Sequence, residues 1–397
     1  MSENKKPRVL VTYMEAGLGH IVTAQAISDA LKKSYSDKLD VIDNYTLRDS
    51  KRKILNKYEK FMVSEVNKHS KYPGYCYLFM WSMHIIGSKN TLKLIHNTIF
   101  YRQLKATVEE YRELNPDAII CTHYFLLYAA IVYRKKVNPD CKVFLYCPDN
   151  MIHGWWDNRV DRLYTNNHIA TEDGLKFRFP KENILEVFYP TRAAVTESNG
   201  TKEEYREKFG IPKDKFAVVV ADGVYAKARA KRATLALLKS KTPMTICLIA
   251  GKNDKLLHEF EKMTDIPEHI TLKVFGFVKD APQLYAACDL FITKAGPNAV
   301  LDSVMMGTPV IMTYYASPME HAVVRLFGKS KRCGYYITSC RRARETAERL
   351  AKNPDELQAL RESCKFFDKN KNGAHDIADD VAKLLRVRED NETKKEA

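Results

Sequence analysis

A histidine that directly follows a Gly-Leu-Gly turn is the first feature of this sequence whose residue types and setting could do chemistry. The stretch EAGLGHIVTAQAI, Glu15 to Ile27, directly follows the apolar run RVLVTY. Such an order of strand, glycine-rich turn and small-residue helix prepares a helix N-terminus, whose free amides attract anions. His20 would stand at that helix start, where the dipole favours the neutral imidazole that a general base requires. The alternative interpretation is a helix cap or a packing residue.

A dinucleotide site would need G-x-G-x-x-G after the first strand. Here Gly17 and Gly19 are followed by Val22, so the third glycine is missing, although Asp43 stands where a ribose-binding acid would be. No G-K-[ST] follows, which excludes a P-loop. The motif therefore disfavours a nicotinamide enzyme. It does not identify which anion the helix N-terminus would bind.

A second anion-binding turn comes much later in the sequence. Lys294-Ala295-Gly296-Pro297 separates an apolar strand from a helix, so the free amides of that helix could hold phosphate and Lys294 could add charge. Asp302 follows about one and a half turns into the helix, where a carboxylate could bind a ribose diol. The alternatives are an ordinary crossover turn and a surface charge.

Short β-rich runs alternate with helical stretches and would position both motifs, which predicts an α/β architecture with parallel sheets. The expected strands of the first half are Arg8–Tyr13, Leu39–Ile42, Asp117–Thr122, Lys142–Cys147, Asp161–Thr165 and Ile184–Tyr189. Those of the second half are Phe216–Ala221, Met244–Ala250, Thr271–Phe275, Asp289–Thr293 and Pro309–Thr313. In each set, strands and helices alternate as in one doubly wound domain. The polar segment Pro190–Gly210 is the expected boundary.

Composition is that of a folded protein of two domains, with 397 residues, 45% hydrophobic and 28% charged. The nine cysteines include no C-x-x-C pair, which favours reduced thiols over a disulfide frame or a zinc site. A polar start that passes directly into a strand, and the lack of long apolar runs, favour a cytoplasmic protein.

The positive charge is concentrated in one segment. The net charge is +15, and residues 48–105 carry twelve Lys and Arg against three Asp and Glu, a net +9. The same segment holds the aromatic block KYPGYCYLFMWSMHIIG, too short to cross a bilayer but suited to its interface. An anionic membrane surface is thus the expected partner. A solvated basic face and a buried helix of an inserted subdomain are the alternatives, and no recognised nucleic-acid motif is present, so no nucleic acid is expected.

Several stretches together resemble one family. FGFVKDAPQLYAACDLFITKAGPNAVLDSVMMGTPVI looks like the C-terminal domain of the monogalactosyldiacylglycerol synthase and processive diacylglycerol glucosyltransferase family, with MurG as a more distant relative. AGLGHIVTAQAI is similar to that family's N-terminal motif. THYFLLYAA, DNMIHGWWDNRVDRLY and FYPTRAAV resemble the segments between them, in the right order. The resemblance covers about residues 7–370 and is weakest over 48–105.

This resemblance implies the GT-B fold, an α/β architecture of two Rossmann-like doubly wound domains that face a cleft. The acceptor-binding domain would span residues 1–195, the donor-binding domain 196–370, and a C-terminal helix with a charged tail 371–397. The implied donor-binding residues are Arg192, Gly223, Phe277, Val278, Ala295, Gly296, Pro297, Asp302 and Glu320. The implied acceptor-binding residues are Gly17, Gly19, His123, Tyr124, His153 and Trp155. The sequence departs from the family at VADGVYAKA, which keeps only Gly223, and at Met319 and Val323, where the family has Gln and Asn.

The implied reaction is an inverting transfer of a hexose from a UDP-sugar, UDP-glucose or UDP-galactose, to diacylglycerol or a glycosyl-diacylglycerol. His20 or Glu15 would be the base, and Arg192 with the amides near Gly296 would stabilise the departing UDP. No carboxylate pair with D-x-D spacing marks a metal site, so a metal cofactor is not expected. The protein would lie on the inner face of the cell membrane. The alternatives are a GT-B transferase for a small metabolite or polyprenyl lipid, a UDP-sugar 2-epimerase of the same fold, and a UDP-binding protein without activity.

Overall fold

The computed structural model describes residues 6–15, 18–71, 78, 88–223, 228–315 and 317–387. The chain divides into two compact units, an N-terminal unit of Met1–Arg192 with Lys371–Ala397 and a C-terminal unit of Ala193–Asn370. The boundary after Arg192 lies within the polar segment Pro190–Gly210 and three residues before position 195, where the first domain was expected to end. Within the described residues, none of the helices combines the length and apolar character that crossing a membrane requires.

The N-terminal unit is built on a six-stranded parallel sheet with the order β2-β1-β3-β4-β5-β6. Its strands are β1 (Arg8–Tyr13), β2 (Asp40–Tyr45), β3 (Ala118–Cys121), β4 (Lys142–Tyr146), β5 (Arg162–Thr165) and β6 (Ile184–Glu186). Its helices are α1 (Leu18–Tyr35), α2 (Lys53–Lys71), α4 (Lys89–Thr98), α5 (Tyr101–Leu114), α6 (Tyr124–Lys136), α7 (His168–Lys176), the 3₁₀ turn η1 (Lys181–Asn183) and α17 (Gly373–Leu384). The central strands are buried on both faces, as parallel sheets require.

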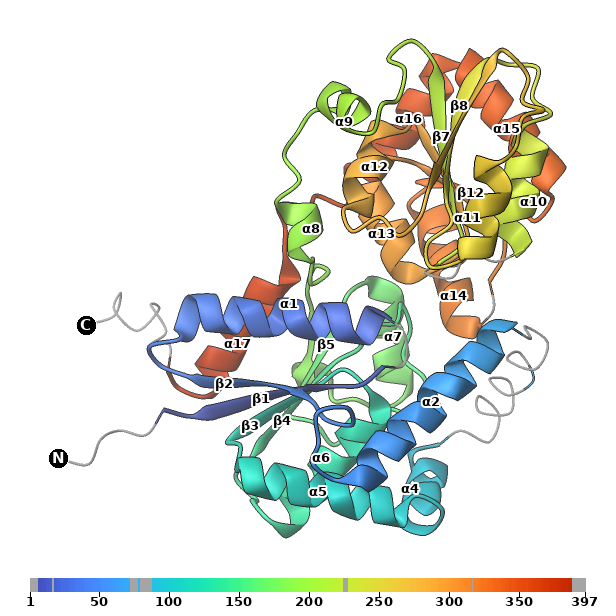
Figure 1. Cartoon of the computed structure of the whole chain (residues 1–397). Coiled ribbons are helices and arrows are strands. Elements are labelled where there is room, and N and C mark those ends of the chain that lie inside the picture. Colours follow the sequence, from blue (N-terminus) through green and yellow to red (C-terminus); the bar gives the residue numbers. More distant parts are fainter. Residues whose placement is uncertain are drawn as a thin grey trace, which may run out of the picture. The chain divides into compact units, whose positions relative to one another are not determined.

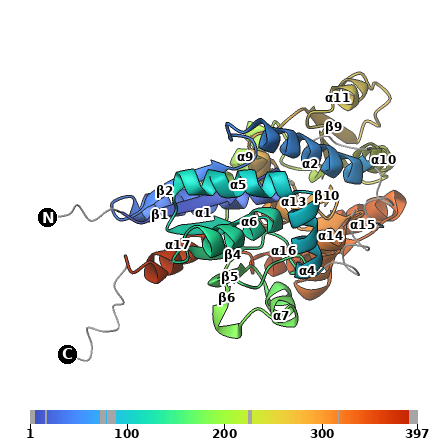
Figure 2. The same cartoon turned by 90° about the horizontal axis from the view of Figure 1, so that it is seen from below.

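Helices cover both faces of this sheet. Helices α1 and α17 lie side by side on one face, and α5 and α6 cover the other (Figure 1). Figure 2 shows the same pairing of α5 and α6 from below. The C-terminal α17 returns to the N-terminal unit at Gly373, where a Cβ would lie only 1.8 Å from the carbonyl oxygen of Phe188. Only glycine permits that close approach of the two backbones.

The C-terminal unit holds a second six-stranded parallel sheet, of order β12-β11-β10-β7-β8-β9. Its strands are β7 (Phe216–Ala221), β8 (Met244–Ile249), β9 (Ile270–Phe275), β10 (Leu290–Thr293), β11 (Val310–Met312) and β12 (Gly334–Tyr336). Its helices are α8 (Ala193–Thr196), α9 (Lys202–Lys208), α10 (Ala228–Leu237), α11 (Asp254–Glu261), α12 (Ala281–Ala287), α13 (Pro297–Met305), α14 (Pro318–Val323), the π-helical turn η2 (Val324–Ser330), α15 (Cys340–Lys352) and α16 (Pro354–Cys364). Both units are thus doubly wound.

All eleven expected strands are present, two with the expected ends and the others with ends that shift by up to three residues, and within the described part of the chain one strand was missed. The missed β12 is a three-residue edge strand that begins at Gly334. A Cβ at Gly334 would lie 1.9 Å from the carbonyl oxygen of Val310, so close pairing with β11 requires the glycine. A strand this short carries too little alternation for its sequence to reveal it.

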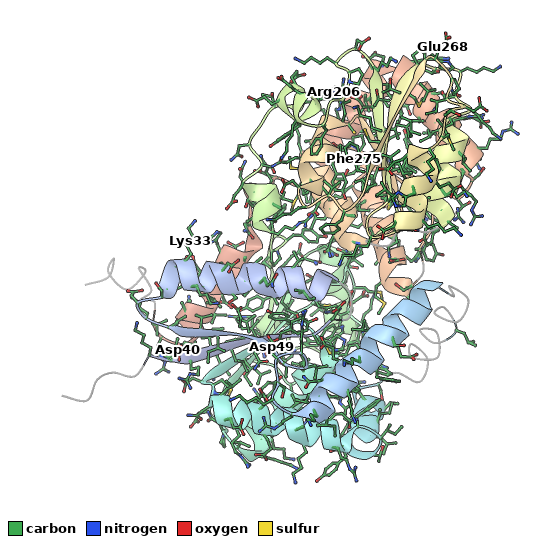
Figure 3. The ribbon with its side chains drawn as sticks, viewed as in Figure 1. Lys33, Asp40, Asp49, Arg206, Glu268 and Phe275 are labelled. Atoms are coloured by element: carbon green, nitrogen blue, oxygen red, sulfur yellow. The ribbon has the colours of Figure 1, made fainter. Side chains whose placement is uncertain are left out.

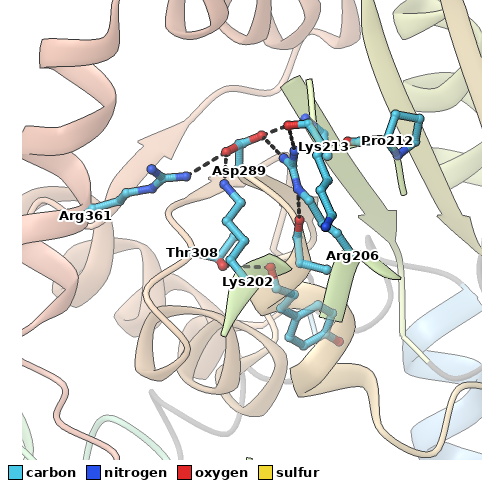
Figure 4. Close-up of polar contacts among 10 residues, drawn as sticks. Lys202, Arg206, Pro212, Lys213, Asp289, Thr308 and Arg361 are labelled. Carbon is cyan, nitrogen blue, oxygen red and sulfur yellow. Dashed lines mark hydrogen bonds and ion pairs between the residues drawn. The ribbon is translucent and has the colours of Figure 1, made fainter. Parts of the chain in front are cut away.

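A buried carboxylate links several elements of the C-terminal unit. It lies at the start of a strand, whereas the motifs follow the ends of strands. Asp289, directly before β10, accepts hydrogen bonds from Lys202, from Arg206 at 2.8 Å and from Arg361 at 2.7 Å (Figure 4). It also accepts the backbone N–H of Ala217 at 2.8 Å. One side chain therefore joins α9 and α16 to the sheet.

Candidate functional site

The order of the N-terminal sheet reverses between β1 and β3, where the chain leaves toward opposite faces. In open α/β sheets this switch point opens a crevice beyond the carboxyl ends of the strands. Glu15 follows β1, His20 lies in the first turn of α1, and His123 follows β3. The fold therefore brings these predicted residues to one edge. Gly17 lies outside the described residues, and Gly19 is in the same turn as His20.

The protonation of the His20 ring follows from its contact. Nδ1 lies 2.5 Å from the carbonyl oxygen of Thr122, and the Thr122 hydroxyl in turn donates to the His20 carbonyl oxygen at 3.2 Å. A carbonyl can only accept, so Nδ1 carries the hydrogen and the Nε2 of a neutral ring keeps its lone pair. His20 therefore does not cap its own helix. Its orientation is that of a general base.

Asp149 is the residue that sequence reasoning missed on this edge. It follows β4, the strand next to β3, and its charge acts on His20. Burial raises the pKa of Asp149, and the positive charge of a protonated His20 opposes that rise. The carboxylate can thus stabilise the imidazolium that forms when His20 takes a proton. An acidic residue just beyond a central parallel strand was the available signal.

The four predicted aromatic and histidine residues of the acceptor set also meet. The ring centroids are 5.2 Å apart for His20 and His123, 4.1 Å for His123 and Tyr124, 6.0 Å for Tyr124 and His153, and 5.4 Å for Tyr124 and Trp155. His123 also caps α6 by accepting the Phe125 N–H at 3.2 Å. Together they form a mostly apolar wall beside the candidate base.

His123 and Tyr124 of this wall, and His96 behind it, are neutral near pH 7. Burial, followed by the charges of His20, His153 and His96, holds the pKa of His123 well below its ordinary value. Burial lowers the pKa of His96, from helix α4, to about 4. Burial and then the charge of Asp149 raise the pKa of Tyr124 to about 12. The wall thus suits an acceptor with little charge.

Glu15 is engaged on the other side of β1. Its Oε2 accepts the hydroxyl of Tyr45, the last residue of β2, at 3.1 Å. Burial, then Glu59 of α2 and Glu15, raise the pKa of Tyr45. Glu15 therefore belongs to a second group of polar side chains, and His20 is the better placed candidate for the base.

The C-terminal sheet has its own switch point, between β7 and β10. Gly223 follows β7 with a φ of +72°, and the expected phosphate turn follows β10. Within that turn, the N–H of Ala295 donates to the Tyr314 carbonyl and that of Gly296 to the Lys294 carbonyl, both at 2.8 Å. The N–H groups of Asn298 and Ala299, in the first turn of α13, precede the first intrahelical bond, which runs from Val300 to the Gly296 carbonyl, and so extend the set of amides that an anion could meet at this helix start.

Side chains around this turn pair in ways that the sequence did not reveal. The ammonium of Lys294, expected beside phosphate, lies 2.5 Å from Oε1 of Glu320. Tyr314 donates to Asp222 at 2.6 Å, and the Arg229 guanidinium lies 5.3 Å from the Tyr314 ring centroid. Asp222 and Tyr314 thus occupy the region where the family's glycine-rich loop is reduced.

The remaining predicted donor residues are found as follows. Asp302 is 6% exposed, so the surface-charge interpretation is wrong. Phe277 is 62% exposed, with the Lys252 ammonium 5.8 Å from its ring centroid, and Val278 is partly exposed. Pro297 begins α13. Arg192 is partly exposed at the end of the N-terminal unit. Among the residues described, no three His, Cys, Asp or Glu side chains form a group that could hold a metal ion.

Each half of the chain matches the model of a known sequence family. Residues 20–187 match the family model of monogalactosyldiacylglycerol (MGDG) synthase, and residues 201–370 match that of glycosyl transferases group 1. The chain is 24% identical over 391 residues to monogalactosyldiacylglycerol synthase 3 of Arabidopsis thaliana, spanning 92% of this chain and 78% of the relative. It is 22% identical over 372 residues to a processive diacylglycerol beta-glucosyltransferase of Bacillus cytotoxicus, spanning 94% and 92%. Alignments with plant relatives span 60–81% of their lengths.

Solved structures share the fold at low sequence identity. MurG of Acinetobacter baumannii matches with a TM-score of 0.58 at 13% identity, over 96% of this chain and all of that one. The UDP-GlcNAc 2-epimerase of Neisseria meningitidis, solved with UDP-GlcNAc bound, matches with a TM-score of 0.58 at 10% identity, over the same 96% of this chain and all of its own. The resemblance inferred from the sequence is therefore confirmed, and the fold is GT-B.

Proposed function

We propose that this chain is an inverting glycosyltransferase that moves a hexose from a UDP-sugar to diacylglycerol or a glycosyl-diacylglycerol on the cytoplasmic face of a membrane. The observation that carries the proposal is His20, whose Nδ1 is fixed by Thr122 and whose Nε2 is therefore basic. It stands in the half of the chain that matches monogalactosyldiacylglycerol synthase.

The proposed transfer requires a general base for the acceptor hydroxyl and groups that stabilise the departing UDP. Nε2 of His20 takes the proton of the acceptor hydroxyl as that oxygen attacks the anomeric carbon from the face opposite UDP. Asp149 stabilises the imidazolium that forms. The departing diphosphate is held by the first-turn amides of α13, with Asp302 assigned to the ribose and Arg192 to the diphosphate. No metal ion is assigned a role.

A lipid acceptor is supported by the surface of the basic segment. Large apolar side chains of α2, of α4, of the connection after α4 and of the first residue of α5 are exposed to solvent: Phe61, Leu94, Ile99 and Tyr101. Exposed lysines flank them, among them Lys57, Lys60 and Lys93. Apolar side chains among cations are the composition that binds a lipid interface. The predicted aromatic block at residues 71–87 lies almost wholly outside the described residues.

The proposal is tested by measuring UDP release with UDP-glucose, UDP-galactose or UDP-N-acetylglucosamine, each with diacylglycerol in mixed micelles. We expect release with a hexose donor only when the lipid is present, unchanged by EDTA. An epimerase, whose fold is the same, would convert its UDP-sugar without an acceptor and without net release of UDP. Release that requires a soluble acceptor or a polyprenyl lipid instead would overturn the diacylglycerol assignment.

A further inference from the structure

We propose that Asn372, the residue directly before α17, is a positioning residue that fixes the backbone of Thr191 and so directs the side chain of Arg192. The inference rests on the proposed function, in which Arg192 binds the diphosphate of the donor. It gives the C-terminal helix a role at the site, although none of the residues predicted to bind a substrate lies in α17.

Two segments of the N-terminal unit meet where the chain leaves this unit and where it returns. The unit ends at Arg192 and resumes at Lys371. The Thr191 N–H donates to Oδ1 of Asn372 at 2.9 Å, and Nδ2 of Asn372 donates to the Thr191 carbonyl oxygen at 3.2 Å. One side chain therefore holds both backbone polar groups of Thr191.

The orientation of the Asn372 amide follows from its partners. Its Oδ1 accepts a second N–H, that of Ala374 at 3.1 Å, so the same side chain also caps α17. A flipped amide would place its NH₂ group against two N–H donors and its oxygen against the Thr191 carbonyl oxygen. Because only the observed orientation satisfies all three groups, Asn372 cannot turn away from Thr191 without loss of the helix cap.

The hydrogen bond to the Thr191 carbonyl acts directly on the next residue. The carbonyl of Thr191 and the N–H of Arg192 belong to one planar peptide group. A bond that holds the carbonyl therefore holds the plane in which the Cα atom of Arg192 lies. Thr191 is buried, and its hydroxyl donates to the Tyr189 carbonyl oxygen at 2.9 Å. The backbone is thus fixed as far as the residue whose side chain has to reach an anion.

The stretch before Arg192 is also joined to the edge that holds the candidate base. The Tyr189 hydroxyl donates to Oδ1 of Asn150 at 2.7 Å, and both side chains are buried. Asn150 directly follows Asp149, whose charge acts on His20. The residue assigned to the leaving group and the candidate base are therefore parts of one connected framework within the N-terminal unit.

Helix α17 gives Asn372 a firm support. Asp380 accepts two hydrogen bonds from the Arg162 guanidinium, at 2.8 and 3.1 Å, and one from the Tyr164 hydroxyl at 2.8 Å. These contacts join α17 to β5. The apolar face of the helix is buried in the same cluster as α1, through Ala374, Ile377, Ala378, Val381 and Ala382.

A further contact of α17 supplies a matched control. Tyr35 is the last residue of α1, in the turn that Lys33 marks in Figure 3. Its hydroxyl donates to Asp379 at 2.6 Å. Tyr35→Phe removes this bond between α1 and α17 but removes none of the bonds between Asn372 and Thr191. The variant therefore separates the docking of α17 from the positioning of the backbone.

The first test follows the backbone and needs no ligand. In Asn372→Ala the Thr191 N–H loses its acceptor, so its hydrogen should exchange with solvent at least about tenfold faster. Asn372→Asp keeps the acceptor oxygen, and Tyr35→Phe keeps the whole contact, so both should retain the protection at Thr191. Unchanged exchange in Asn372→Ala would overturn the proposal.

The second test compares UDP and uridine by calorimetric titration. Asn372→Ala and Asn372→Asp both lose the bond to the Thr191 carbonyl, so each should bind UDP about tenfold more weakly. Uridine, which offers no phosphate to Arg192, should bind as it does to wild type. Tyr35→Phe should leave both affinities unchanged. Equal losses of UDP affinity in Tyr35→Phe and Asn372→Asp would show that Asn372 acts only through the docking of α17, and the positioning role would be refuted.

A double substitution tests whether Asn372 acts through Arg192. Arg192→Ala alone should weaken UDP binding, and the addition of Asn372→Asp should cause no further loss. A full additional loss would contradict the proposal. If wild type binds no UDP, the proposed function fails by itself, and the exchange rate at Thr191 still decides whether Asn372 fixes this backbone.

Discussion

At the scale of single residues, the base is the point on which the proposed chemistry depends. Replacement of His20 by Ala removes the only ring nitrogen that the geometry assigns to the acceptor hydroxyl. We expect turnover to fall by ~10²-fold or more, with UDP binding unchanged because the phosphate turn lies in the other unit. Calorimetric titration with UDP and a steady-state assay measure the two effects.

A second substitution separates the base from the hydrogen bond that orients it. His20→Gln can still donate to the Thr122 carbonyl but offers no base. It should therefore fold normally and be as slow as His20→Ala. Near-normal turnover in either variant would exclude His20 as the base and return the role to Glu15.

Asp149 supplies the next prediction at this scale. Asp149→Asn keeps the size of the side chain but removes the charge that faces a protonated His20. We expect turnover to fall on the order of tenfold to hundredfold with little change in stability, because burial already penalises the ionised carboxylate. The pH profile of turnover for this variant, measured beside wild type, is the check. A variant with the wild-type profile would place Asp149 outside the mechanism.

At the scale of elements, Asp289 joins helices to the second sheet. Burial alone would raise the pKa of Asp289, but Lys202, the Ala217 amide and Arg206 hold it below the ordinary value. It therefore contributes stability above the unfolded pKa of about 3.9, and this contribution is lost as pH falls through the lower folded pKa. Asp289→Asn leaves buried cations without their counter-charge and should cost about 3–5 kcal/mol.

The position of the tryptophans allows the unfolding of the N-terminal unit to be followed separately. All three, Trp81, Trp155 and Trp156, belong to the N-terminal unit. In urea unfolding at pH 7, Asp289→Asn should advance a transition seen by circular dichroism and leave the tryptophan transition in place. A common shift of both signals would show that the two units unfold as one. Glu345→Gln, which loses an exposed pair on α15, is the control with no expected shift.

The elements also show what sequence can predict. Every strand of four or more residues was found from its β-rich run, because buried parallel strands are nearly continuous apolar stretches. His20 was found because its glycines mark the turn after β1. Asp149 was missed because His20, on which its charge acts, is far away in sequence and shares its sheet edge only through the strand order. The bonds that the Ala295 and Gly296 amides make within their turn are likewise set by the fold, and no spacing reveals them.

At the scale of the whole molecule, the net charge of +15 has to be divided between a specific surface and a general one. If the basic segment binds lipid, the position of the positive charges on the protein must determine the binding, and the total charge must not. Lys57→Glu with Lys60→Glu reverses two exposed cations of α2, and Lys255→Glu with Lys262→Glu reverses two exposed cations at α11 of the other unit. Both variants lower the net charge equally.

Flotation with phosphatidylglycerol-containing vesicles distinguishes the two explanations. Each lysine near an anionic surface contributes about 1 kcal/mol, so the α2 variant should bind at least about tenfold more weakly and the α11 variant should bind as wild type. The contribution of the exposed apolar side chains is tested by a matched pair of variants. Leu94→Ser on α4 should weaken vesicle binding, and Leu175→Ser on α7, which is also exposed, should not. Equal losses in both charge variants would mean that the positive charge acts only as a diffuse field, and the lipid acceptor would then lose its structural support.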